Sequence, residues 1–253
     1  KQPTSDLHNM FSDQSAIIVC PGPSLQKNIS VLKKVKGRAL IICVLHALKV
    51  LKENGITPDI VIHTDPQNLK VLKTGDEESD PTLWEKWVRD EYFDGVKYFV
   101  TSSACVPDMF TIPSENILWM SSGIAVGDAF PISVYDYGRV GGSVSHSAFD
   151  LAIEFGFTSI ALVGQDLSLS DKGAVYSDGS ELDKEADKNL TLGETFVVDG
   201  LNGKKVTTNS TYDFFAKMYS LFARELEGSG VNLFNCTEGG RFIEGFDHIT
   251  LDQ

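Results

Sequence analysis

The fold class of this chain is set by one stretch, Ala16-Ile17-Ile18-Val19-Cys20-Pro21-Gly22-Pro23-Ser24-Leu25. Residues 16–19 are apolar without alternation, which predicts a strand buried on both faces of a parallel sheet. From residue 25 to residue 32 apolar side chains recur at helical spacing. Pro23 and Ser24 suit the first turn and the N-cap of that helix. The stretch therefore predicts a strand, a tight turn and a helix.

The turn of this stretch has the properties of an anion-binding site. Gly22 lacks a Cβ, so a ligand can approach its backbone closely. A helix N-terminus presents free N–H groups and the positive end of the helix dipole. We therefore expect Gly22, Pro23, Ser24 and Leu25 to hold a phosphate, although such turns are also common without a ligand. The glycine spacings of the dinucleotide fingerprint and of the P-loop are absent.

Strands and helices alternate along the rest of the chain. This order predicts an α/β, Rossmann-like fold, a mostly parallel sheet with helices on both faces and a small β-hairpin excursion. Ser210 and Asp213 resemble a capping box at the start of the last helix. The expected strands are residues 39–44, 60–63, 98–100, 117–119, 159–163 and 231–234, with a strand-like segment at 130–137, a hairpin of 195–198 and 205–208, and helices over 46–53, 144–154 and from 210 onward.

Two segments stand apart from this alternation. Residues 1–15 form a polar lead-in segment, from which Leu7, Met10 and Phe11 are expected to dock on the core. Residues 168–192 are polar and rich in glycine, which predicts a lid or a mobile loop. We expect residues 16–253 to form a single Rossmann-like domain. Because the chain begins at Lys1 without an initiator Met, we also expect it to be excised from a longer protein.

Composition excludes several classes of partner. The 253 residues carry a formal net charge of -13, which argues against nucleic acid and against a membrane surface as partners. No membrane-spanning run or signal peptide is visible. The cysteines, Cys20, Cys43, Cys105 and Cys236, lack metal or redox spacing, so reduced thiols, no metal site and a cytoplasmic location are expected.

Polar residues follow several of the predicted strands. In an open α/β sheet, ligands bind at the carboxyl ends of the strands, near the point where strand order reverses. Asp65 and Asp166 both lie at such ends and suit acid/base work or Mg²⁺ binding. An Asx turn at Asp65 and an N-cap at Asp166 are equally good structural alternatives. Gly164, Gln165, Thr237 and Glu238 lie at strand ends as well.

Two histidines open predicted helices. His46 and His146 can each present an imidazole to the cleft as a base or a hydrogen-bond donor, but a structural role is the more common one. Gly142 and Ser143 precede the second of these helices and suit another anion site or an ordinary cap. The residues do not show the Gly-x-Ser-x-Gly elbow of a serine hydrolase.

The ordered motifs of the chain resemble a known family. They are Gly22-Pro23-Ser24-Leu25, Asp65-Pro66, Gly164-Gln165-Asp166-Leu167 and Thr237-Glu238-Gly239-Gly240. In this combination the chain resembles the motility-associated factor (Maf) flagellin glycosyltransferases and the 6-hydroxymethylpterin pyrophosphokinase-like proteins grouped with them. Cys20 replaces the first glycine of the family's turn, and His46 stands where a small polar residue or Asn is expected.

The resemblance implies a nucleotide-sugar-binding domain similar to bacterial sialyltransferases. It implies that Gly22, Pro23, Ser24 and Leu25 hold the nucleotide and that Asp65 and Asp166 line the catalytic pocket. Gly142 and Ser143 would lie nearby, Thr237 and Glu238 would close the far rim, and His146 is a candidate for the catalytic histidine. The site residues expected to bind the nucleotide sugar also include His46, Gly164 and Gln165.

Three functions follow from these expectations. The first is transfer of a nonulosonic (sialic-acid-like) sugar from a CMP donor to Ser or Thr of flagellin, with the CMP-sugar as substrate and no further cofactor. The second is diphosphate transfer from ATP to a hydroxymethylpterin-like substrate, with Mg²⁺ held by Asp65 and Asp166. The third is a non-catalytic module that binds a nucleotide or flagellin.

Overall fold

The computed structural model describes residues 2–64, 91–102, 117–120, 142–170, 173–180 and 194–253. In this part of the chain one nine-stranded sheet has the order β1-β6-β5-β4-β3-β2-β7-β10-β11, and all neighbouring strands are parallel. The strands are β1 (Gln2–Pro3), β2 (Ser15–Val19), β3 (Leu40–Val44), β4 (Ile60–His63), β5 (Tyr98–Ser102), β6 (Ile117–Met120), β7 (Ser159–Val163), β10 (Asn232–Asn235) and β11 (Asp247–His248).

Strand β2 is the centre of this sheet. The chain first moves outward from β2 through β3, β4, β5 and β6, then returns to place β7 on the other side of β2. Strand order therefore reverses between β2 and β7, which run in register from Ser15 opposite Ser159 to Val19 opposite Val163. The carboxyl ends of these two strands are the place where a doubly wound sheet binds its ligand.

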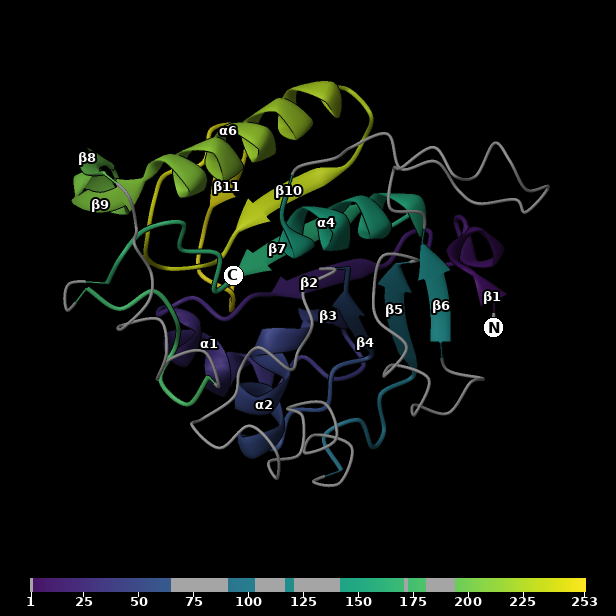
Figure 1. Cartoon of the computed structure of the whole chain (residues 1–253). Helices are drawn as coiled ribbons and strands as arrows, with labels where there is room; N and C mark the ends of the chain where they lie inside the picture. The colour runs from purple at the N-terminus through teal and green to yellow at the C-terminus, as the bar shows by residue number, and fades with distance from the viewer. Residues whose placement is uncertain (1, 65–90, 103–116, 121–141, 171–172, 181–193) are drawn as a thin grey trace.

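Helices cover both faces of the sheet. Figure 1 shows α1 (Leu25–Leu32) and α2 (Leu45–Glu53) on one face, with α4 (Val144–Glu154) and α6 (Ser210–Glu225) on the other. Helix α6 packs on α4 through aromatic side chains, for example Phe149 stacked on Phe222 and in edge contact with Tyr219. All three of these rings are buried. The Rossmann-like α/β fold expected from the sequence is confirmed.

A two-stranded antiparallel sheet stands apart from the main sheet. It consists of β8 (Thr195–Asp199) and β9 (Lys205–Asn209), joined through the 3-10 helix η6 (Leu201–Gly203). The hairpin lies at the start of α6 (Figure 1). Its turn is held against the carboxyl-terminal segment, because the Leu201 N–H donates to the Gly240 carbonyl at 3.2 Å and Gly200 bridges to Arg241. The predicted hairpin is confirmed.

Some local expectations need correction. Helix α6 is capped by Asn209, whose side chain accepts from the Tyr212 N–H at 2.8 Å, rather than by Ser210. The lead-in segment contributes strand β1 to the sheet edge and a 3-10 helix, η1 (Thr4–Leu7). Leu7 is buried as expected, but Met10 is 60% exposed. The segment at 130–137, residue Asp65 and residues 171–172 and 181–192 of the predicted loop lie outside the described residues.

Candidate active site

Three turns that follow β2, β7 and β10 meet at one edge of the sheet. The Gly22 N–H donates to the Gly164 carbonyl at 2.8 Å, which joins the first turn to the second. The Gln165 N–H donates to Thr237 Oγ1 at 3.2 Å, and the Arg241 N–H donates to the Asp166 carbonyl at 2.8 Å, which join the second turn to the third. The described turns in which the sequence predicted polar site residues are therefore brought together.

Gly22 is required by this packing of turns. A Cβ on Gly22 would lie 2.2 Å from Asp166 Oδ2 and 2.3 Å from the Gly164 carbonyl oxygen. Gly164 has a φ of +67°, and a Cβ there would lie 2.1 Å from the Cys20 carbonyl oxygen. The close backbone approach that the sequence assigned to a ligand is made here by another loop of the same chain.

Asp166 is the acidic residue at the centre of the site. The Ser24 hydroxyl donates to Asp166 Oδ2 at 2.8 Å, and the Ser24 N–H donates to the same oxygen at 3.2 Å. A carboxylate thus already occupies the N-terminus of α1, where the sequence predicted a phosphate. Burial raises the pKa of Asp166 to about 6, because it outweighs the hydrogen bonds from Ser24 and the positive charge of Lys27.

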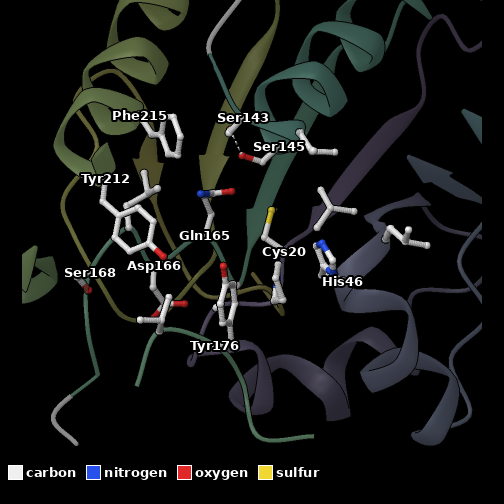
Figure 2. A pocket seen from close by; sticks show the side chains of 18 of the residues that line it. Cys20, His46, Ser143, Ser145, Gln165, Asp166, Ser168, Tyr176, Tyr212 and Phe215 are labelled. Atoms are coloured by element: carbon white, nitrogen blue, oxygen red, sulfur yellow. Dashed lines mark hydrogen bonds between the residues drawn. The ribbon is translucent and has the colours of Figure 1, made fainter. Parts of the chain in front are cut away.

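A cavity of about 180 Å³ lies between the ends of β2 and β7. Figure 2 shows Tyr212 on one side of it and His46 on the other, with Gln165 and Cys20 between them. None of the described residues lining it is a Lys or an Arg. Its hydroxyl, amide, imidazole and aromatic groups come from His46, His63, Ser143, Ser145, Gln165, Ser168, Tyr176, Tyr212 and Phe215.

Tyr176 reaches this cavity from the segment after β7. That segment folds back on the first turn, because the Ser177 N–H donates to the Pro21 carbonyl at 2.7 Å. Gln26 Nε2 then donates to Ser177 Oγ at 3.1 Å. Tyr176 and Tyr212 share a side-chain hydrogen bond, and burial raises the pKa of both phenols. Both hydroxyls are therefore protonated at neutral pH, and because one donates its proton to the other, one O–H of the pair is available to a ligand.

His146 does not reach the cavity. Its side chain is fully buried between α4 and α6, with Nδ1 2.9 Å from Ser143 Oγ and Nε2 3.1 Å from the Phe215 carbonyl oxygen. The imidazole also packs against the ring of Tyr219, with 4.3 Å between the ring centroids. Because both ring nitrogens have partners and the side chain is fully buried, this geometry favours a structural role for His146 over the predicted catalytic one.

Residues 1–172 match the family described as 6-hydroxymethylpterin diphosphokinase MptE-like, which is more than half of the chain. The chain belongs to this family. The resemblance to Maf and MptE-like proteins inferred from the motifs is thereby confirmed.

The fold of this MptE-like chain is similar to a solved structure described as that of MAf glycosyltransferase from Magnetospirillum magneticum AMB-1. The TM-score is 0.70 at 20% sequence identity, a similarity that shows the fold. The match covers 98% of the MptE-like chain but 37% of the glycosyltransferase chain. No curated protein matches the sequence.

The remaining predicted residues of the MptE-like chain have different surroundings. His46 lines the cavity, and its ring lies edge-on to that of His63 with 6.2 Å between the ring centroids. Ser143 lines it too, and its side chain caps α4 by accepting from the His146 N–H. Leu25 is fully buried in the core, and Gly142 is exposed with a φ of +78°. Pro23 and Glu238 line a second cavity on the other side of Asp166.

Sequence reasoning missed the aromatic wall of the cavity. Tyr212 and Phe215 belong to α6 and line the cavity, but neither was among the predicted site residues. Their position in the first two turns of α6, directly after the hairpin, was the available signal that they extend past the strand ends. Tyr176 had no such signal, because long-range contacts of an irregular segment place it.

In the described part of the MptE-like chain, no group of three or more His, Cys, Asp or Glu side chains is placed to hold a metal ion. No described helix has the length and apolarity needed to span a bilayer. The described cysteines Cys20, Cys43 and Cys236 are buried free thiols, and burial raises their pKa.

Proposed function

We propose that this chain is a transferase domain that moves a nonulosonic (sialic-acid-like) sugar from a CMP donor to a hydroxyl, with Ser or Thr of flagellin as the acceptor. The observation that carries the proposal is the wall of the cavity at the β2–β7 reversal. It combines hydroxyl, amide and aromatic groups with one described carboxyl group, Asp166. The fold similarity to a glycosyltransferase supports the same class of reaction.

The charge of the wall favours a nucleotide sugar over a nucleoside triphosphate. A triphosphate is usually neutralised by lysine, arginine and a divalent cation. The described wall contains neither lysine nor arginine, and no described cluster of side chains suits a metal ion. The single phosphate of a CMP-sugar needs less compensation, which hydroxyl groups of the wall, such as that of the Tyr176–Tyr212 pair, can supply by donating hydrogen bonds.

Asp166 is the group we assign as general base. The acceptor hydroxyl gives its proton to the Asp166 carboxylate while its oxygen bonds to the anomeric carbon of the sugar. The bond from that carbon to the phosphate oxygen breaks, and its electron pair leaves with CMP. With a pKa of about 6, the carboxyl is mostly ionised at neutral pH and can accept the proton. The transfer rate should therefore fall as the pH drops below about 6.

Size limits how the donor sits. At about 180 Å³, the cavity is smaller than the roughly 300–1,000 Å³ typical of ligand pockets. We therefore place the sugar–phosphate linkage in it, with the rest of the donor extending beyond the described walls. Tyr212 and Phe215 offer aromatic faces on which a ring of the donor can pack.

The family description favours a second candidate function, diphosphate transfer from ATP to a hydroxymethylpterin-like substrate. A thermal-shift panel of CMP, CMP-sugars and ATP, each with and without Mg²⁺, separates the two, because a ligand of the folded state raises its melting temperature. Stabilisation by CMP without metal supports the glycosyltransferase. Stabilisation only by ATP with Mg²⁺ overturns it in favour of the diphosphokinase, and no response to any of them favours the non-catalytic module.

A further inference from the structure

A second cavity, of about 380 Å³, lies on the other side of Asp166 from the first. Its walls come from the start of α1, from the turn of the β8–β9 hairpin and from the turn after β10. The two cavities share three described wall residues, Asp166, Ser168 and Tyr176. These three side chains therefore form a partition between two neighbouring spaces.

The walls of the second cavity are fixed by contacts between distant segments. Lys27 Nζ donates to the Glu238 carbonyl oxygen at 2.8 Å, which ties α1 to the turn after β10. The hairpin is tied to the turn after β7, because Thr208 Oγ1 donates to the Leu167 carbonyl at 2.9 Å and the Leu169 N–H donates to the Thr207 carbonyl at 2.8 Å. The space is therefore built by the fold.

The two carboxyl oxygens of Asp166 have different surroundings. Oδ2 accepts both hydrogen bonds from Ser24. Oδ1 lies beside Gly239, a wall residue of the second cavity, since a Cβ on Gly239 would lie 3.4 Å from it. A proton acceptor in this position serves a group that approaches from the second cavity.

The second cavity also differs from the first in charge. Its described walls carry charged side chains of both signs, Lys27 and Lys204 against Asp166, Asp178 and Glu238. Such mixed walls suit a polar, uncharged ligand better than an anion such as a nucleotide. The described walls of the first cavity contain no lysine or arginine and include more aromatic rings.

We propose that the second cavity binds the acceptor of the transfer, a polar group that carries a hydroxyl, while the first cavity holds the donor. The inference rests on the proposed function. The acceptor oxygen crosses the partition beside Tyr176 and bonds to the anomeric carbon, its proton passes to Asp166, and CMP leaves with the electron pair of the broken bond. The same hydroxyl chemistry can come from a Ser or Thr of a polypeptide or from a small polyol.

Two variants fill the second cavity from different walls. Ala174→Phe and Lys204→Phe each add a ring at a residue that lines the second cavity and is absent from the described walls of the first. Lys205→Phe is the matched control, because Lys205 is the exposed neighbour of Lys204 and lines neither cavity. Melting temperatures establish that each variant is folded.

The test measures CMP binding and sugar transfer separately, with a CMP-linked nonulosonic acid as donor and either flagellin or glycerol as acceptor. Both filling variants are expected to reduce transfer by about tenfold or more while CMP affinity stays within about twofold. Lys205→Phe should change neither quantity. The acceptor that loses the most transfer in the filling variants identifies the source of the hydroxyl.

Two results would count against the proposal in different ways. Full transfer by both folded filling variants, or an equal loss of CMP binding and transfer, overturns the acceptor assignment and leaves the glycosyltransferase proposal standing. A wild-type protein that neither binds CMP nor transfers the sugar overturns the proposed function, and the acceptor site with it.

Discussion

Asp166 links the stability of this protein to its proposed chemistry. The buried carboxyl is 7% exposed and accepts two hydrogen bonds from Ser24, yet its pKa is raised from 3.8 to about 6. Between these two pH values the folded state binds more protons than the unfolded state, so stability falls as the pH rises through this window. Above it, ionisation costs about 3 kcal/mol of folding free energy.

Removing this charge should stabilise the fold. We expect Asp166→Asn to raise the free energy of unfolding by up to about 3 kcal/mol at pH 8, because an amide oxygen can still accept from Ser24 without carrying a charge. The gain should disappear near pH 4. Urea unfolding of both proteins at pH 4, 6 and 8 measures it, with exposed Asp178→Asn as control. A less stable variant at pH 8 would contradict the prediction, and sugar transfer should be lost in either case.

Steric contacts restrict position 22 to glycine. We expect Gly22→Ala to cost about 2 kcal/mol or more, because its Cβ would overlap Asp166 Oδ2 and the Gly164 carbonyl oxygen. Gly239→Ala is the matched control, because a Cβ at residue 239 would lie 3.2 Å from its nearest neighbour, Ser24 Cβ. Its other two close neighbours, Asp166 Oδ1 and Lys27 Nζ, are the ends of side chains. Chemical denaturation of both variants should show the larger loss at Gly22. Equal losses would mean that the turns can separate at little cost.

At the scale of elements, two features determine where the aromatic wall lies. They are the contact between α4 and α6 and the junction of the β8–β9 hairpin with α6. Helix α6 starts directly after β9, and its first two turns carry Tyr212 and Phe215 over the end of the sheet. His146 on α4 positions this part of α6 through its hydrogen bond with the Phe215 carbonyl. The position of the cavity wall therefore depends on how α4, α6 and the hairpin pack together.

A structural role for His146 predicts that removing its side chain lowers the stability of the fold. His146→Ala removes a buried ring and leaves the Phe215 carbonyl without this partner, so a loss of about 2–4 kcal/mol is expected. CMP affinity per folded molecule should stay within about twofold, measured at a temperature where the variant is folded. A folded variant with intact CMP binding but no transfer would instead restore the catalytic role.

The cap of α6 provides a matched pair of neighbouring substitutions. Asn209→Ala should cost about 1 kcal/mol, because the Tyr212 N–H loses its side-chain acceptor. Ser210→Ala should stay within about 0.5 kcal/mol, since Ser210 is exposed and belongs to the helix itself. Thermal unfolding checks both values. The reverse order would restore the capping box predicted from the sequence.

At the scale of the whole molecule, the fold follows from patterns that are local in sequence. Apolar runs such as residues 16–19 and 159–163 mark strands because both faces of a parallel sheet are covered. The meeting of the strand-end turns also follows, since parallel strands end at one edge. The order in which strands lie beside β2 follows only from the doubly wound topology.

The details of the site depend on contacts that no local pattern encodes. The hydrogen bonds of Ser24 with Asp166 join residues 142 positions apart in the sequence. Tyr176 comes from an irregular segment held by Pro21 and Gln26, and the second cavity exists only because the hairpin turn docks beside Gly240. Glycines that suggested a ligand proved to be packed against neighbouring loops.

The central position of β2 has a consequence for the order of folding. One edge of β2 pairs with β3, which follows it closely in the chain, but the other edge pairs with β7, which begins at Ser159. During synthesis the middle strand therefore exposes an unpaired edge until β7 has been made and has left the ribosome. Such distant pairings slow folding and leave a hydrophobic strand open to aggregation. The site, whose carboxyl group follows β7 directly, can therefore form only after this pairing has been made.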